Sequence, residues 1–525
     1  MARRPFTPDE LLELRQLAAQ WGKIVARRAF GDGGPGLDID FASMEQIAHA
    51  AAQGLTEGTL QTLLDGHTAA LGDEQPCPDC GTPCPVRRHE RSLQAKGSNS
   101  PGANRSPTAP PVGGIFSPRR PILRLDGHGY SPSVLQTVVT AAARLGSFAD
   151  AAFAPSLCDV AISPRPVQQL TREVGTEMAA ARDAQAEARR PRVLEPRVPT
   201  TPDVVGVEVD GGRLRTRASG CGPGVHRAEG KEVKAACPAT LTAAAGDVDA
   251  CPEPPPSFVE PRRIRRLAAR MKGAAGEAKV REKTGESAGD MRVSPTPPAG
   301  EPRSPRRVVR TCVAGPSDSH AFGPMTAAEA QSRNFYAAGR RAFVADGAAY
   351  NWTIRRGYFP DFEPIVDLLH AVCYLFGAAH AVGAEGERWP RYVRRLRSAW
   401  RGRVAEVIAE TSALREELGR PPPEEELAAS DPRRVASEAV TYLGNNAGRM
   451  DYPRYRREGL PTTSSLVESL VGEFNARVKG WSKFWNRPDG AEAILQVRAA
   501  LPSEDGRLER FFANRPGRPY RRHAA

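Results

Sequence analysis

The chain has 525 residues, a formal net charge of +12 at pH 7 and a sequence pI near 9.5. This length predicts more than one domain, since single cores stop growing near roughly 250 to 300 residues, and the positive charge favours a polyanionic partner, nucleic acid first. No apolar run reaches the roughly 18 residues of a membrane span, and the nine cysteines do not form a disulfide framework, so we expect a cytoplasmic protein without membrane contact.

Residues 1–75 are predicted to form a small helical domain. Thr7 and Glu10 have the spacing of a capping box around Pro8, which predicts a helix that runs to about Phe30. Two further helical stretches are expected at 44–52 and 56–70. We interpret this domain as a packing or oligomerisation module.

Cysteine spacing suggests half of a zinc site in the next segment, 76–125. Cys77 and Cys80 form a C-x-x-C pair with Cys84 close behind, but a zinc ribbon needs a second pair some 15 to 30 residues on, and none is present. Residues 95–111 are instead rich in Ser, Pro, Gly and Asn, which is typical of disorder. We therefore expect a degenerate ribbon that binds zinc weakly or not at all.

Residues 126–200 are predicted to be helical again. An apolar face spans 134–142, and a second helix begins near Ser163 with polar and basic side chains in its first turns. If this segment is a helix-turn-helix, Gln168, Gln169 and Arg172 are the candidate base-reading residues. An ordinary helical linker domain remains the alternative.

An α/β core is expected from residue 201, in two parts at 201–250 and 311–384. Its first part reads as two strands around the hairpin Gly211-Gly212, with Asp210 at the end of the first strand. Turn chemistry alone is another explanation for that acid. The proline-rich, basic residues 251–310 are predicted to be a disordered insertion with at most one helix, at 262–271, serving either as a phosphate-contacting tether or as a passive linker.

The second part of the core contains two further candidate residues. A strand at 310–314 and a helix at 325–340 precede the buried strand 342–345, which ends at Asp346. Gly347 follows it, where backbone can approach a ligand closely. A second apolar run, 364–369, leads to His370, for which a core histidine is the alternative reading.

The last part of the chain supplies a third acid. A helical insertion is expected at 385–455, the last core helix within 456–512, and a disordered basic tail at 513–525. Glu468, Asn475 and Lys479 form a polar stripe on that helix, which could equally be a solvated face. Three carboxylates, Asp210, Asp346 and Glu468, are the hard oxygen ligands that a two-metal phosphoryl-transfer site requires.

Five stretches together resemble one family, the DDE insertion-sequence transposases of the ISKra type. They are VEVDGGRLRTRASGCGPGVH, AFGPMTAAEA, AFVADGAAYNW, FEPIVDLLHAVCYLFGAAHAVG and LPTTSSLVESLVGEFNARVKGWSKFW. The resemblance covers most of the chain and implies an RNase-H-like mixed sheet with flanking helices, preceded by an all-α DNA-binding region.

The resemblance also implies chemistry and partners. Asp210, Asp346 and Glu468 would hold two Mg²⁺ or Mn²⁺ ions about 3.5 to 4 Å apart. His370 matches the D-x-x-H that follows the second acid in these enzymes. The substrates would be double-stranded terminal repeats and target DNA, cut and joined by a homo-oligomer that associates with the nucleoid when it binds.

One departure from the family concerns the zinc ribbon. The family usually has a second C-x-x-C followed by Arg-Arg-x-Phe-Phe-Pro, and shifting the codons of residues 109–118 by one nucleotide permits that pattern. We therefore hypothesise a compensated frameshift across residues 93–119. The broken ribbon motivates an alternative function, a non-catalytic DNA-binding relic or repressor of transposition, and an RNase-H-like nuclease is a further one.

Overall fold

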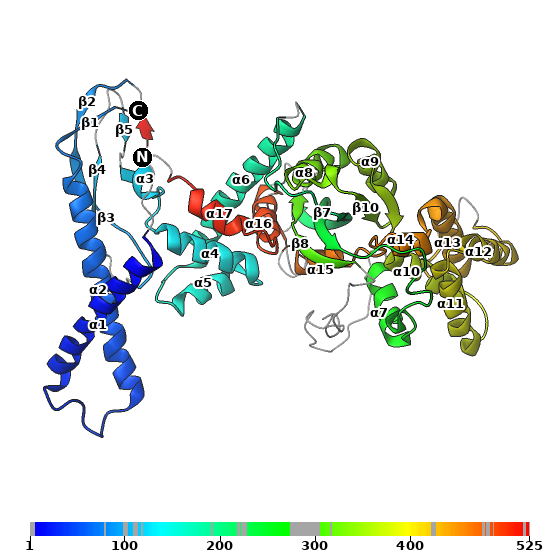
Figure 1. Cartoon of the computed structure of the whole chain (residues 1–525), viewed down its shortest axis with the longest axis horizontal. Helices are drawn as coiled ribbons and strands as arrows, with labels where there is room; N and C mark the ends of the chain where they lie inside the picture. Colours follow the sequence, from blue (N-terminus) through cyan, green and yellow to red (C-terminus); the bar gives the residue numbers. More distant parts are fainter. Residues whose placement is uncertain are drawn as a thin grey trace. The chain divides into compact units, whose positions relative to one another are not determined.

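The computed structural model divides the chain into two compact units (Figure 1). One comprises Met1–Leu170 with Glu509–Ala525, and the other Thr171–Leu508. The structure describes residues 6–77, 80–97, 103–108, 114–116, 119–190, 193–217, 221, 228–272, 305–315, 318–421, 427–474, 478, 484–486, 488–517 and 521–523.

Two long helices begin the first unit, α1 (Pro8–Phe30) and α2 (Phe41–Ala69). The predicted capping box at the start of α1 is confirmed: Thr7 Oγ1 accepts from the Glu10 amide, and the Glu10 carboxylate accepts from the Thr7 amide. The two stretches expected at 44–52 and 56–70 are one continuous helix. The prediction of a break was wrong because a glycine within a helix, here Gly54, costs only about 1 kcal/mol.

Short antiparallel strand pairs complete this part of the unit. Their strands are β1 (Glu74–Pro76), β2 (Pro83–Pro85), β3 (Arg87–Ser92), β4 (Ala103–Thr108), β5 (Gly114–Phe116) and β12 (Arg521–His523). β3 pairs with β4, and β5 pairs with β12. Disorder was expected for residues 95–111 and for the tail, so β4 and β12 differ from that expectation. Local composition cannot anticipate such strands, because their backbone hydrogen bonds come from a distant partner.

The rest of the first unit is helical, as predicted for the segment from residue 126. Its helices are α3 (Arg119–Leu123), α4 (Pro132–Arg144), α5 (Phe148–Ser156) and the start of α6 (Pro164–Arg189). The predicted apolar face of α4 is buried. The end of α17 (Arg507–Asn514) also belongs here, and beyond it the buried Arg515 pairs with the buried Asp126 at 2.5 Å. The chain after residue 513 is therefore not wholly a free tail.

A mixed sheet forms the centre of the second unit. Its strands are β6 (Val204–Arg217), β7 (Ala228–Thr242), β8 (Arg306–Arg310), β9 (Val313–Gly315), β10 (Arg340–Ala345) and β11 (Glu363–Val366). The strand order is β11-β10-β6-β7-β8, and β9 also pairs with β7. β6 is parallel to β10, which is parallel to β11, while β7 is antiparallel to β6 and β8.

The hairpin predicted at Gly211-Gly212 does not exist. β6 runs unbroken through both glycines, and all its 14 residues pair with β7, including Gly211 with Lys234 and Gly212 with Val233. The pair of glycines resembles a turn signal, but fourteen consecutive cross-strand pairs outweigh the local preference. Asp210 therefore lies within an extended strand, and the turn explanation for it is wrong.

Helices cover the sheet on both faces. Ala235 and Ala236, adjacent on β7 and therefore pointing to opposite faces, belong to different apolar cores. The first core includes α7 (Pro261–Lys272), α8 (Ser319–Ser332), α9 (Ala349–Tyr358), α10 (Leu368–His380), α11 (Glu385–Trp400), α12 (Val404–Leu418), α13 (Pro432–Asn446) and α14 (Tyr452–Arg457). The second core includes α15 (Ser465–Phe474) and α16 (Pro488–Ala500). The helical insertion predicted at 385–455 is confirmed as helical.

Of the disordered insertion predicted at 251–310, residues 251–272 and 305–310 are ordered, and residues 273–304 lie outside the described residues. Residues 251–272 are packed on the core: the Trp400 indole donates to the Cys251 carbonyl at 2.7 Å, and Ile264 of α7 is buried. At the other end, β8 begins at Arg306, four residues before the predicted strand. The sequence pattern did not predict this packing, because the segment is rich in proline and its contacts come from the distant helices α10 and α11.

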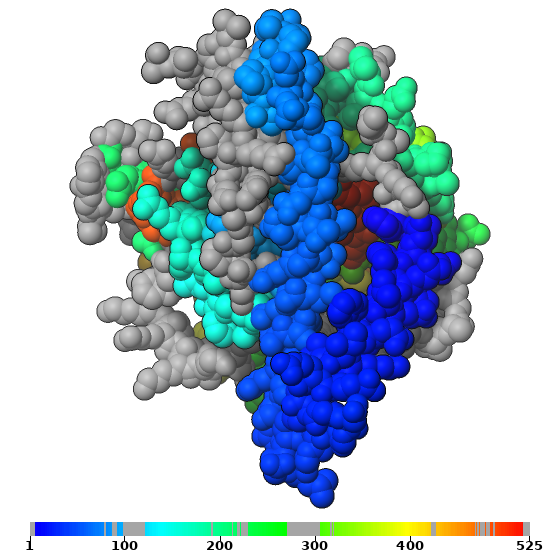
Figure 2. All heavy atoms as spheres, turned by 90° about the vertical axis from the view of Figure 1, so that its left-hand side faces the viewer, coloured from blue at the N-terminus to red at the C-terminus, as the bar shows by residue number. Residues whose placement is uncertain are grey.

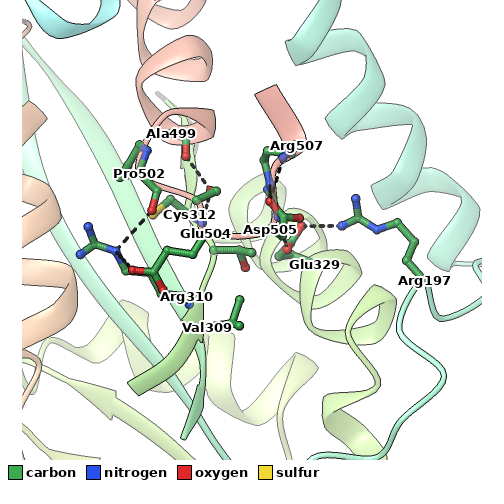
Figure 3. Close-up of polar contacts among 12 residues, drawn as sticks. Arg197, Val309, Arg310, Cys312, Glu329, Ala499, Pro502, Glu504, Asp505 and Arg507 are labelled. Atoms are coloured by element: carbon green, nitrogen blue, oxygen red, sulfur yellow. Dashed lines mark hydrogen bonds and ion pairs between the residues drawn. The ribbon is translucent and has the colours of Figure 1, made fainter. Parts of the chain in front are cut away.

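An ionic network around the buried Glu329 joins the segment after α16 to α8 and β8 (Figure 3). Arg507 donates to the buried Glu329 at 2.5 Å, and Arg197 reaches the same carboxylate at 3.3 Å. Burial alone would raise the pKa of Glu329, but the charges of Arg507 and Arg197 outweigh it, and this pKa is lowered. Glu504 accepts from the Arg310 amide at 2.9 Å, so the end of the chain's second unit is fastened to β8 as well.

Among the described residues, no helix is long and apolar enough to cross a membrane.

Candidate functional site

Two of the three predicted acids occupy neighbouring positions on adjacent parallel strands, Asp346 just after the end of β10 and Asp210 within β6. Ala345 of β10 pairs with Val209 of β6, and the next residue on each strand is an acid, Asp346 and Asp210. Both acids are partly exposed. The register therefore places the two acids at adjacent positions where β10 ends, and both are reachable by solvent or a substrate.

The Asp346 side chain is held by the turn that follows it. Its Oδ1 accepts from the Ala348 amide at 2.9 Å and from the Asn351 side chain at 2.8 Å. Gly347 has φ of +96°, and a Cβ there would lie 2.8 Å from the Tyr442 ring, so the turn requires glycine. Tyr442 also donates to the Asp346 carbonyl at 2.9 Å, which fixes the backbone of the acid.

Gly211 makes room for a tyrosine beside Asp210. A Cβ at Gly211 would lie 2.7 Å from the Tyr350 hydroxyl. Burial, followed by the charges of Asp346 and Asp210, raises the pKa of Tyr350 well above its usual range. The buried Lys234 ammonium lies 3.9 Å from the centre of the Tyr350 ring and pairs with Glu232.

His370 interacts electrostatically with both acids, Asp210 and Asp346. Burial alone would lower the pKa of His370. A 2.7 Å hydrogen bond from its Nδ1 to Asp367 Oδ2 and the charge of Asp367 outweigh burial. Together with the smaller contributions of Asp346 and Asp210, they raise the pKa of His370 to about 9. The imidazole is therefore protonated at neutral pH. With Nδ1 engaged, only Nε2–H is available to another acceptor. This placement favours the active-site reading of His370 over the core reading.

Asp367 connects three elements from a fully buried position. Its backbone amide donates to the Ala345 carbonyl at 2.8 Å, and its carboxylate accepts from the Leu369 amide at 3.1 Å and the Ser464 amide at 2.9 Å. Burial opposes ionisation, but the hydrogen bonds from His370 and these amides lower the pKa of Asp367. The start of α10, the end of β10 and the residue before α15 are thus held together by one residue, β10 through its backbone amide and the other two through its carboxylate.

A second buried carboxylate, Glu208, holds the first turn of α15. Its Oε2 accepts from the Leu466 and Val467 amides, both at 2.9 Å, and Glu208 is only 2% exposed. These amides are among the unpaired donors of a helix N-terminus, which favours negative charge. Glu208 and Asp210 are two residues apart on β6 and so point to the same face of the sheet.

Glu468, the third predicted acid, is the fourth residue of α15. Its side chain lies outside the part that the structure describes, and so do Asn475 and Lys479 entirely. The backbone of Glu468 is nevertheless on the helix whose first turn is anchored beside Asp210 by Glu208. Whether its carboxylate joins the other two stays a prediction.

The three candidate DNA-reading residues are exposed on α6. Gln168, Gln169 and Arg172 alternate there with the buried Val167, Leu170 and Thr171. Their readout of DNA stays a prediction.

The donor set at Asp210 and Asp346 suits a hard divalent cation. The carboxylates are oxygen ligands, and their charges add to burial in raising the pKa of Tyr350 and to Asp367 in raising the pKa of His370. Among the described side chains, no group of three His, Cys, Asp or Glu residues is arranged to hold a metal. A complete site would therefore need a ligand such as Glu468 from outside that set.

Sequence reasoning missed Glu208, Lys234 and Tyr350. Glu208 had a signal, because a glutamate in an otherwise apolar strand must find partners when it is buried. Lys234 and Tyr350 had none, since only the pairing of β7 with β6 and the position of α9 bring them to Asp210.

The three clustered cysteines lie on and around the β1–β2 hairpin. The Cys77 and Cys84 side chains are buried, and burial, then the proximity of Cys77 and Cys80, raises the pKa of the Cys84 thiol. Zinc binds the thiolate, so a raised pKa weakens a site that already lacks a fourth cysteine.

We expect the purified chain to hold much less than one equivalent of zinc. Replacing Ala109 and Val112, which lie outside the described residues, by cysteine should supply the missing pair and yield about one tightly held zinc per chain. Metal analysis of both proteins after dialysis measures this. A full equivalent in the unaltered chain would show that the ribbon is intact.

Comparison of the chain with protein-family models and with curated proteins gave no match.

Proposed function

We propose that this chain is a DDE-type transposase of a bacterial insertion sequence, which cuts and joins DNA strands at the ends of its element through an RNase-H-like core. The observation that carries the proposal is the register of β6 and β10, which aligns Asp210 with Asp346 where β10 ends. The strand order β11-β10-β6-β7-β8 supports it, because the RNase-H-like core has three antiparallel strands with two parallel strands added beside the first. The net charge of +12 is consistent with DNA as the substrate.

The residues around the acids have complementary roles in this proposal. Asp210 and Asp346, with Glu468 as the expected third ligand, would hold Mg²⁺ or Mn²⁺, which when bound polarises phosphoryl oxygens and lowers the pKa of water. The protonated His370 can donate from Nε2 to a phosphate oxygen, and Asp367 fixes the orientation of its ring. Glu208 and Asp367 set the position of α15 relative to β6.

The proposal is tested with linear DNA that carries both flanks of the gene. The purified chain and Mg²⁺ should release strands at defined ends and join them to a second DNA, which sequencing gels resolve. Cleavage without end preference or joining would favour a nuclease instead. End-specific binding without any cleavage would favour the non-catalytic relic or repressor.

Removing the charge of Glu208 should weaken catalysis without unfolding the chain. The change Glu208→Gln preserves volume but leaves the Leu466 and Val467 amides with a neutral acceptor, so α15 should shift relative to Asp210. We expect the Mg²⁺ concentration for half-maximal cleavage to rise about 10- to 100-fold, as is usual when a group that orients metal ligands is lost. Glu229→Gln, on an exposed carboxylate of β7, is the matched control and should leave the titration unchanged. The same Mg²⁺ requirement in both variants would show that Glu208 does not position the catalytic site.

A further inference from the structure

One side of α1 carries a seam of large apolar side chains that remains open to solvent. Leu14, Leu17, Trp21 and Ile24 recur at intervals of three and four residues, and their exposed fractions are 53, 61, 54 and 56%. None of the described residues of α1 is buried, although the helix contacts α2. Figure 2 shows α1, in dark blue, lying along α2 on the face turned to the viewer. A helix of 23 residues with this seam exposed resembles one half of an interface.

The seam has a symmetry of its own. Extended by one step at each end, it begins at Glu10 and finishes at Arg28, so the intervals along it are four, three, four, three and four residues. This is the spacing of coiled-coil contact positions. Seam residues at equal distances before and after residue 19 form complementary pairs. Two pairs are apolar, Leu17 with Trp21 and Leu14 with Ile24, and the third joins an acid to a base, Glu10 with Arg28.

We infer that α1 pairs in antiparallel orientation with α1 of a second copy of the chain, across a two-fold axis at the level of residue 19, midway between Leu17 and Trp21. Each of the three matches then occurs twice, as an isologous interface requires. The two Glu10–Arg28 pairs close the ends of the interface and set its direction, because a parallel pair would place like charges together.

The charge pattern of α1 favours a second copy over a membrane surface. A helix that lies on lipid carries basic residues along its polar face. In α1 the first turn carries Asp9 and Glu10, the last turn carries Arg27 and Arg28, and Arg15 between them lies on the side away from the seam. The acidic start of α1 is therefore complementary in charge to the basic end of a second α1 that runs in the opposite direction. The pairing does not depend on the proposed catalytic function.

Sedimentation equilibrium of the full chain over a range of concentrations tests the interface. The unaltered chain should be a dimer, and Leu17→Asp should raise the dimer Kd about thirtyfold or more, the effect of losing a central interface residue. Leu12→Asp is the matched control, because Leu12 is equally exposed at 51% but lies on the other side of α1. A monomeric unaltered chain, or equal weakening by both variants, would overturn the inference. Far-UV circular dichroism of both variants shows that α1 remains folded.

Charge reversal tests the direction of the pairing. Glu10→Arg and Arg28→Glu should each weaken self-association, since each variant places like charges at both ends of its own dimer. An equimolar mixture of the two should associate as tightly as the unaltered chain, because both end pairs are again opposite in charge. Arg28→Glu leaves the Thr7–Glu10 capping box intact, so its effect cannot come from fraying of the helix start. Unchanged Kd in both single variants, or no recovery in the mixture, would rule out the antiparallel arrangement.

Discussion

Replacing Asp210 or Asp346 by asparagine should abolish strand cleavage and joining while leaving DNA binding intact. Each change keeps the side-chain volume but removes a negative charge from the pair that the β6–β10 register creates. A catalytic divalent ion supplies several kcal/mol of charge stabilisation, and losing about 4 kcal/mol lowers the rate about a thousandfold. Gel assays of cleavage and filter binding of the same DNA measure the two effects separately.

Asp361→Asn is the control for both variants. Asp361 is exposed in the loop before β11, so the same chemical change there should leave cleavage unaffected. Cleavage at a near-normal rate in Asp210→Asn or Asp346→Asn would remove that acid from the site. Loss of DNA binding together with cleavage would instead indicate that the substitution had distorted the sheet around the two acids.

The variant Glu329→Gln should destabilise the second unit by about 1.5 to 3 kcal/mol, because hydrogen bonds to a buried charged carboxylate become neutral ones. Arg507 would keep the Asp505 carboxylate at 2.9 Å but lose the charge of Glu329 at 2.5 Å, and Arg197 would lose that charge at 3.3 Å. Urea unfolding at pH 7 followed by circular dichroism measures the change. Glu416→Gln removes an exposed carboxylate that also faces two arginines, and its unfolding curve should match that of the unaltered chain.

The same pair carries a pH dependence with a definite sign. The pKa of Glu329 is lowered in the folded chain, so its contribution to stability is complete above 4.5, the ordinary value for glutamate. That contribution is lost as the pH falls through the lowered folded value. The Glu329→Gln variant should therefore lose less stability on acidification than the unaltered chain. Parallel acid dependence of the two proteins would show that Glu329 is not ionised against its arginines.

Features that depend on neighbouring residues could be read from the sequence. The capping box of Thr7 and Glu10 was predicted correctly because its donors and acceptors lie three residues apart. The strand that ends at Asp346-Gly347 was predicted for a similar reason, since a buried apolar run followed by an acid and a glycine is a local pattern. The apolar face of α4 follows from helical periodicity alone.

Features that depend on distant partners could not be read in this way. The sequence shows Gly211-Gly212 as a turn, and only the strand β7 keeps it extended, so that Asp210 lies in line with Asp346. Glu208 was passed over because its partners, the Leu466 and Val467 amides, lie more than 250 residues further along the chain. The sequence by itself determined which residues could bind a metal or begin a helix, because those properties belong to side chains and their neighbours. The tertiary structure alone decided which of them meet, because pairing between strands and burial of charge depend on segments that the local pattern does not contain.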